Sequence, residues 1–175
     1  MDPKSLAEQA QQEYQKGAYA AAADLFLQAA QAYESAQDAL NAAEMKNNQS
    51  VALLQAGKAE AALQATDGTE EIFLKAGDLK RQGIAVANRA AAYEGMNKIN
   101  EALGEYNRAG EIFEAIGEGD MHSVVRKATA QIYLKRGYVG QTHMDVMDSL
   151  RLVEKPTFSQ RVLKFLMRWG LLKPK

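Results

Sequence analysis

The stretch GAYAAAADLFLQAA, residues 17–30, contains the features from which the fold is predicted. Its glycine returns 40 and 120 residues later as Gly57 and Gly137, with Asn97 at the intermediate position. A structural unit that returns at a fixed interval is stacked on copies of itself and buries a continuous core between them. Small residues keep the same spacing in three sets: Ala10, Ser50, Ala90 and Ala130; Ala22, Ala62, Ala102 and Thr142; Ala29, Thr69, Ala109 and Ser149.

Turn-forming residues divide each period into two helices. Asp2 and Pro3 predict the start of a helix that runs to about Lys16, and a second helix is expected from about Tyr19 to Ala36. Segments of this length pack as antiparallel hairpins. Further breaks are expected at Gln37-Asp38, Gly57, Gly77-Asp78, Asn97, Gly117-Glu118 and Gly137.

The predicted fold class is all-α, a right-handed solenoid of about four antiparallel helical hairpins over residues 1–155, followed by a C-terminal helix over residues 156–175. We expect three solid hairpins and a fourth whose second helix is looser, because Thr142 and Ser149 replace alanine there. Large side chains that return every 40 residues are interpreted as core between hairpins and not as a stacking platform for bases or a cofactor. They are Tyr14, Leu53, Tyr93 and Tyr133, then Phe26 and Tyr106, then Tyr33, Phe73 and Phe113.

A small residue three positions before tyrosine, then Gly–x–Tyr–x–x–Ala and an aromatic residue, resembles the tetratricopeptide repeat. The stretches at residues 17–30 and 87–109 carry the resemblance best, and it covers about residues 5–153. The 40-residue period is similar to the subclass found in Pins-type adaptors, kinesin light chains and soluble NSF-attachment proteins. HEAT and armadillo repeats have a similar period but lack the turn signature, so they rank second.

A partner-binding groove is predicted on the first helix of each hairpin, which lines the concave face of such a stack. Asn48 and Asn88 occupy the same place in successive repeats, and the resemblance implies that such asparagines hold the backbone of an extended peptide. Their amides donate and accept hydrogen bonds at once. A helix-to-helix hydrogen bond or plain solvation is the other interpretation. The predicted groove residues are Gln11, Asn47, Asn48, Val51, Ala87, Asn88, Ala91, Lys127 and Gln131.

The C-terminal segment differs in charge from the rest of the chain. Residues 151–175 contain seven basic residues and one acidic residue, a formal charge of +6, which leaves −7 elsewhere for a total of −1. Thr157 and Gln160 have the form of a capping box for an amphipathic helix. That helix could cap the last repeat, lie on an anionic membrane surface, or dock onto an acidic partner or a neighbouring subunit. The predicted docking residues are Phe158, Arg161, Lys164, Phe165, Arg168 and Trp169.

The sequence offers no pattern for catalysis. It contains no cysteine, His122 and His143 lack metal-ligand spacing, and no glycine-rich phosphate loop is present. A net charge of −1 does not favour nucleic acid. We therefore predict a protein that is not an enzyme and that has no metal, no cofactor, no small-molecule substrate and no nucleic-acid partner.

The predicted function is a non-enzymatic scaffold or adaptor that binds a peptide or helix of another protein in its concave groove. The alternative is a membrane-peripheral assembly factor that uses the basic C-terminal helix as anchor or docking element. Met1–Gln12 lacks the pattern of a secretory signal, and no apolar run approaches the roughly 18 residues of a membrane span. A cytoplasmic location is expected on these grounds.

Overall fold

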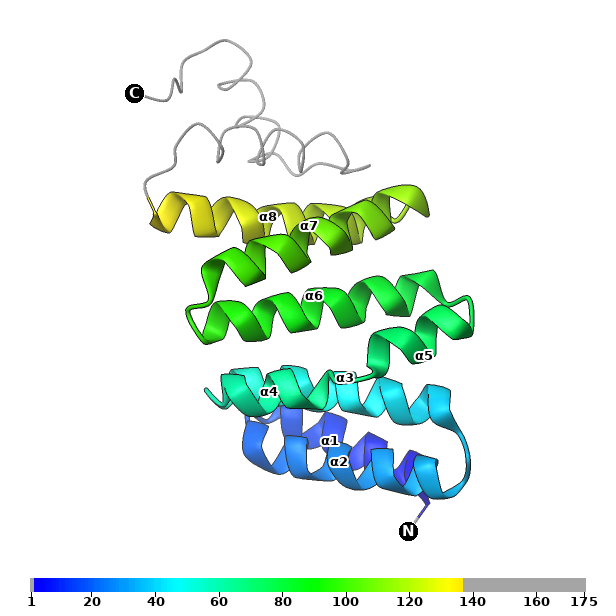
Figure 1. Cartoon of the computed structure of the whole chain (residues 1–175). Helices are drawn as coiled ribbons and strands as arrows, with labels where there is room; N and C mark the ends of the chain where they lie inside the picture. The colour runs from blue at the N-terminus through cyan, green and yellow to red at the C-terminus, as the bar shows by residue number, and fades with distance from the viewer. Residues whose placement is uncertain (1, 137–175) are drawn as a thin grey trace, which may run out of the picture. The chain divides into compact units, whose positions relative to one another are not determined.

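The computed structural model describes residues 2–136, which form eight α-helices joined by short turns (Figure 1). The helices pack as stacked antiparallel pairs, so the predicted all-α hairpin architecture is confirmed. The chain divides within α7 into two compact units, Met1–Glu105 and Tyr106–Lys175. The bounds are α1 Pro3–Gln15, α2 Tyr19–Ser35, α3 Ala39–Gln55, α4 Ala59–Ala65, α5 Thr69–Lys75, α6 Leu79–Gly95, α7 Ile99–Ala115 and α8 Gly119–Lys135.

Positive-φ residues end the helices at intervals of 20 residues in the described part of the chain. After α1, the Gly17 N–H donates to the Tyr14 carbonyl at 3.0 Å and the Ala18 N–H donates to the Glu13 carbonyl at 2.9 Å. This pair of bonds is the Schellman motif, and it satisfies carbonyls that the helix end leaves unpaired. The same pair recurs after the other helices that end this way. The residues with positive φ at these ends are Gly17, Gln37, Gly57, Gly77, Asn97 and Gly117.

Aspartate side chains begin the first helix of each pair in the first unit. Asp2 accepts a hydrogen bond from the Ser5 N–H at 3.0 Å and Asp38 from the Asn41 N–H at 3.1 Å, which confirms the predicted start of α1. Asp78 caps α6 in the same way. The backbone N–H of Asn41, and then its side-chain amide, stabilise the ionised carboxylate and lower the pKa of Asp38. These caps satisfy N–H groups that would otherwise lack a partner.

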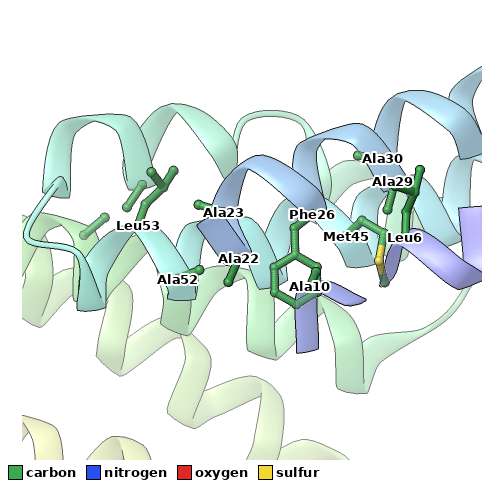
Figure 2. Packing of buried hydrophobic residues seen from close by; sticks show 12 residues of the cluster. Leu6, Ala10, Ala22, Ala23, Phe26, Ala29, Ala30, Met45, Ala52 and Leu53 are labelled. Carbon is green, nitrogen blue, oxygen red and sulfur yellow. The ribbon is translucent and has the colours of Figure 1, made fainter. Parts of the chain in front are cut away.

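Small residues, mostly alanines, and a few large apolar side chains make the core of the first unit. Ala10, Ala22 and Ala62 have no exposed surface, and Phe26 is 3% exposed. Figure 2 shows the Phe26 ring next to Ala10 of α1 and Ala22 of its own helix. Alanine at these positions lets the helix backbones approach closely, as the repeat pattern predicts. The recurring large side chains Phe26, Leu53, Phe73, Tyr106 and Phe113 are buried as predicted, whereas Tyr14, Tyr33, Tyr93 and Tyr133 are half-buried.

The second unit begins in α7 and continues through α8. Gly110 of α7 is buried, and a Cβ at this position would lie 3.4 Å from Cδ2 of His122 in α8. Glycine at this position therefore allows the two helices to pack closely. The predicted loose helix of the fourth hairpin, with Thr142 and Ser149, lies outside the described residues.

The second hairpin departs from the expected regular pattern. Its second helix is divided into α4 and α5 by Thr66, Asp67 and Gly68, and Gly68 has a φ of 71°. The hydroxyl of Thr66 donates to the Leu63 carbonyl at 2.7 Å. Side-chain bonds to nearby carbonyls compete with helical bonds, and a left-handed residue ends the helix. The expectation of three solid hairpins is therefore wrong for the second.

Candidate functional site

A small pocket brings together three of the predicted groove residues. Gln11 of α1 and Asn48 and Val51 of α3 line a space of about 110 Å³, with Tyr14 and Phe26 completing its walls. Gln11 is exposed, and Asn48 and Val51 are half-buried. Two amide side chains from the first helices of adjacent hairpins therefore line one pocket together with two aromatic rings and a valine. This combination suits a polar main chain that carries an apolar side chain.

Asn47 lies in the core and not in the groove. It is 4% exposed, and its Oδ1 accepts a hydrogen bond of 3.1 Å from the Thr69 hydroxyl. The Thr69 hydroxyl is also 2.8 Å from the Thr66 carbonyl, at the break between α4 and α5. Asn47 thus ties α3 to the broken helix, and we remove it from the predicted groove.

The remaining predicted groove residues occupy two other helices. Asn88 and Ala91, with Ala87, lie on α6 and are half-buried. Lys127 and Gln131 lie on α8 in the second unit, where both are exposed. Their surfaces are accessible, so all of them stay in the predicted contact set.

An ion cluster that the sequence interpretation missed lies beside the helix break. Arg89 of α6 donates through Nη2 to Glu70 of α5 at 2.5 Å and to Glu105 of α7 at 2.8 Å, and through Nε to Glu105 at 3.0 Å. The side chains of Arg89, Glu70 and Glu105 are 21%, 10% and 19% exposed. Gln82 donates to Oε1 of Glu70 at 3.4 Å. The cluster links three helices through groups that water reaches poorly.

Burial and hydrogen bonding act in opposite directions on the charge of Arg89. Removal from water disfavours the guanidinium, whereas the hydrogen bonds to Glu70 and Glu105 favour it. The hydrogen bonds win, so the pKa of Arg89 lies above its ordinary value. Arg89 is therefore charged at neutral pH.

A larger pocket opens where the helix is broken. Its volume is about 290 Å³, and its walls come from α4, the break and α6. Asp67-Gly68 is a turn signal in the sequence, and it could have indicated this site. The association of Arg89 with carboxylates 16 and 19 residues away has no comparable local signal. The lining residues are Leu63, Gln64, Thr66, Asp67, Arg89 and Tyr93.

The predicted C-terminal docking residues lie outside the described part of the chain. They are Phe158, Arg161, Lys164, Phe165, Arg168 and Trp169. Among residues 2–136, no helix is long and apolar enough to cross a membrane. The same residues contain no group of three or more histidine, cysteine or acidic side chains that could hold a metal ion.

Comparison with known proteins identifies the repeat family. The soluble NSF attachment protein family, one of the groups that the sequence resembles, matches residues 2–165. No curated protein matches the chain. The family match covers all of the described helices, including the broken one. The chain therefore belongs to the soluble NSF attachment protein family, whose repeats are similar to the tetratricopeptide repeat.

Proposed function

We propose that this chain is an adaptor that holds a segment of a partner protein across α1 and α3. Membership of the attachment protein family gives it a non-enzymatic, protein-binding role. The observation that supports the α1–α3 surface is the shared pocket of Gln11, Asn48 and Val51. Its amides come from equivalent helices of adjacent hairpins, so a segment that crosses the stack meets both of them.

The chemistry of this pocket suits a peptide main chain. Each amide can donate to a carbonyl and accept from an N–H of the bound segment, and one such bond contributes about 0.5–1.5 kcal/mol. Tyr14 and Phe26 add an apolar surface for one side chain. The family name states attachment to NSF, and we extend that partner to this chain. Asn88, Ala91, Lys127 and Gln131 are proposed to extend the contact on α6 and α8.

Capture of partners tests the proposed surface. The double variant Gln11→Ala/Asn48→Ala and the control Gln12→Ala/Gln31→Ala are compared with the natural chain in binding to purified NSF and in capture from native lysate. Gln12 and Gln31 are exposed residues of α1 and α2 outside the pocket. We expect binding about tenfold weaker for the first variant, since two hydrogen bonds are removed, and no change for the control. Equal binding by both variants would refute the assigned surface.

The basic segment 156–175 supports a second candidate contact. Its charge contrasts with the negative remainder, and the family match extends into it as far as residue 165. We keep it as a proposed docking or membrane-anchoring element. A chain that ends at Lys155 and retains its helical circular dichroism separates the two surfaces. Loss of NSF binding by this shorter chain would assign recognition to the C-terminal segment, and unchanged binding would assign it to the repeats.

A further inference from the structure

We propose that the pocket at the break between α4 and α5 binds the carboxamide of a glutamine or asparagine side chain in a partner segment. The proposal rests on the protein-binding role given above and adds a second contact point to it. The pocket belongs to α4 and α6, whereas the groove proposed above belongs to α1 and α3. The two contacts can therefore be tested separately.

The break creates the space for this ligand. Thr66 stands 40 residues after Phe26, which fills the core of the first hairpin, and 40 residues before Tyr106. A threonine in place of an aromatic ring is much smaller. Its hydroxyl is engaged with the Leu63 carbonyl at 2.7 Å, which holds the end of α4 in place. The resulting pocket of about 290 Å³ is large enough for a carboxamide and its aliphatic stem.

Arg89 supplies oriented hydrogen-bond donors at this pocket. Its Nε and Nη2 are bonded to Glu70 and Glu105, so the plane of the guanidinium is fixed on two sides. Its Nη1 makes no hydrogen bond with the described residues. Arg89 lines the pocket, and Nη1 carries two N–H groups. A ligand oxygen can accept from this group without displacing a carboxylate.

The local charge favours a neutral acceptor over an anion. The positive charge of Arg89 is already compensated by Glu70 and Glu105, and Asp67 places a further carboxylate on the wall of the pocket. A second anion would face this carboxylate with no cation other than Arg89 among the lining residues to balance it. A carboxamide oxygen carries only a partial negative charge, so it can use Nη1 without that repulsion.

The other walls complement the remaining groups of a carboxamide. The Asp67 carboxylate and the Gln64 amide oxygen can accept from its NH₂ group, which a carboxylate ligand lacks. Leu63 and the Tyr93 ring provide an apolar surface for the CH₂ groups of the stem. Donors from Arg89, acceptors from Asp67 and Gln64, and an apolar surface in one pocket would together select a carboxamide over a carboxylate or an ammonium group.

Short peptides test this selectivity on the full chain. The ¹⁵N-labelled protein is titrated with Ac-Ala-Gln-Ala-NH₂ and with the Glu and Lys counterparts of that peptide, and amide shifts are followed by NMR. We expect the Gln peptide to shift the Gly68 backbone signal and the Gln64 side-chain signals. The Glu peptide should bind about tenfold or more weakly, because it loses a donor and gains a repulsion. Equal or tighter binding of the Glu or Lys peptide, or no shift at Gln64 and Gly68, would overturn the proposal.

Two variants test whether Arg89 and Gln64 bind the carboxamide. Arg89→Lys keeps the charge but lacks the Nη1 donors, and Gln64→Ala removes an exposed amide without touching the ion cluster. Both should weaken Gln-peptide binding, Arg89→Lys by about tenfold, whereas the exposed control Gln28→Ala on α2 should not. If Arg89→Lys fails to fold, Gln64→Ala still decides the outcome. Normal peptide binding by Gln64→Ala would refute the pocket assignment. Loss of NSF binding by Gln11→Ala/Asn48→Ala concerns only the α1–α3 groove.

Discussion

The second helices of the first two hairpins begin alike and then differ. α2 runs unbroken over Tyr19–Ser35, whereas the same length of chain in the next hairpin is α4, a three-residue break and α5. Glu70 stands where the first hairpin has Ala30, a fully buried residue. At this position the first hairpin buries an alanine, whereas the second must accommodate a carboxylate. The comparison shows that a change from small to charged residues occurs together with a change in backbone path.

The break and the ion cluster depend on each other physically. Glu70 is 8% exposed and needs a partner, which Arg89 of α6 provides. Buried polar groups in the second hairpin also include Asn47, Thr66 and Thr69, which are joined by hydrogen bonds. The donors and acceptors of such a network must all meet their partners, so the network restricts how the helices can pack. The core of the second hairpin therefore contains hydrogen-bonded and charged side chains, unlike the core of the first hairpin.

Removal of Arg89 is expected to have the largest effect. Arg89→Met leaves Glu70 and Glu105 without their shared partner, so the free energy of unfolding should fall by about 3 kcal/mol in urea denaturation. Arg81→Met is the matched control, because Arg81 is 39% exposed in its ion pairs and should contribute about 1 kcal/mol or less. If both variants lowered the free energy of unfolding equally, the Arg89 cluster would stabilise the fold no more than an exposed ion pair does.

The close approach of α6 to the start of α4 gives the next largest effect. A Cβ at Gly95 would lie 2.9 Å from the Ala59 Cβ, so Gly95→Ala should destabilise the protein by about 1–3 kcal/mol in thermal or chemical unfolding. Gly104→Ala in α7 meets nothing within 4 Å and should stabilise by about 0.5–1 kcal/mol. Ala59→Gly combined with Gly95→Ala should recover part of the loss. A loss that persists in this double variant would show that the contact with Ala59 is not its cause.

The left-handed residue at the break should have a smaller effect. Gly68 has a φ of 71°, and a Cβ there meets nothing within 4 Å, so the loss comes from backbone conformation alone. Gly68→Ala should lower the free energy of unfolding by about 1 kcal/mol. Asp67→Ala at the adjacent exposed position is the control and should cost less. If Gly68→Ala were as stable as the natural chain, a continuous helix over residues 59–75 would be accessible to this hairpin.

The smallest effect concerns the pH dependence of the Asp38 cap on α3, the first helix of the second hairpin. Backbone and side-chain hydrogen bonds from Asn41 lower the pKa of Asp38 below 3.8, so the ionised cap contributes stability above that value. This contribution is lost as the pH falls through the lowered pKa. Asp38→Asn keeps a capping side chain without the charge. The natural chain should be more stable than Asp38→Asn near about pH 6, and the difference should shrink toward about pH 3. A pH-independent difference would contradict the assignment.

The repeat and the ends of the helices could be predicted because their signals are local. Gly17, Gly57 and Gly77 lie at turns and have positive φ, and Asp2 caps α1 as predicted. Gln11, Asn48 and Val51 meet in one pocket because equivalent helical positions of adjacent hairpins are brought together. Asn47, one residue before Asn48, faces the core, because successive residues of a helix point about 100° apart around its axis.

The sequence alone determined the helical class, the 20-residue spacing of the turns and the alanine faces that pack together. Each depends on residues within one or two turns of helix, where backbone preferences act directly. Only the tertiary structure decided that Arg89 joins Glu70 and Glu105, that Asn47 is buried against Thr69, and that the break forms a pocket. Those outcomes depend on how whole helices rotate and settle against one another, which no neighbouring residue in the sequence specifies.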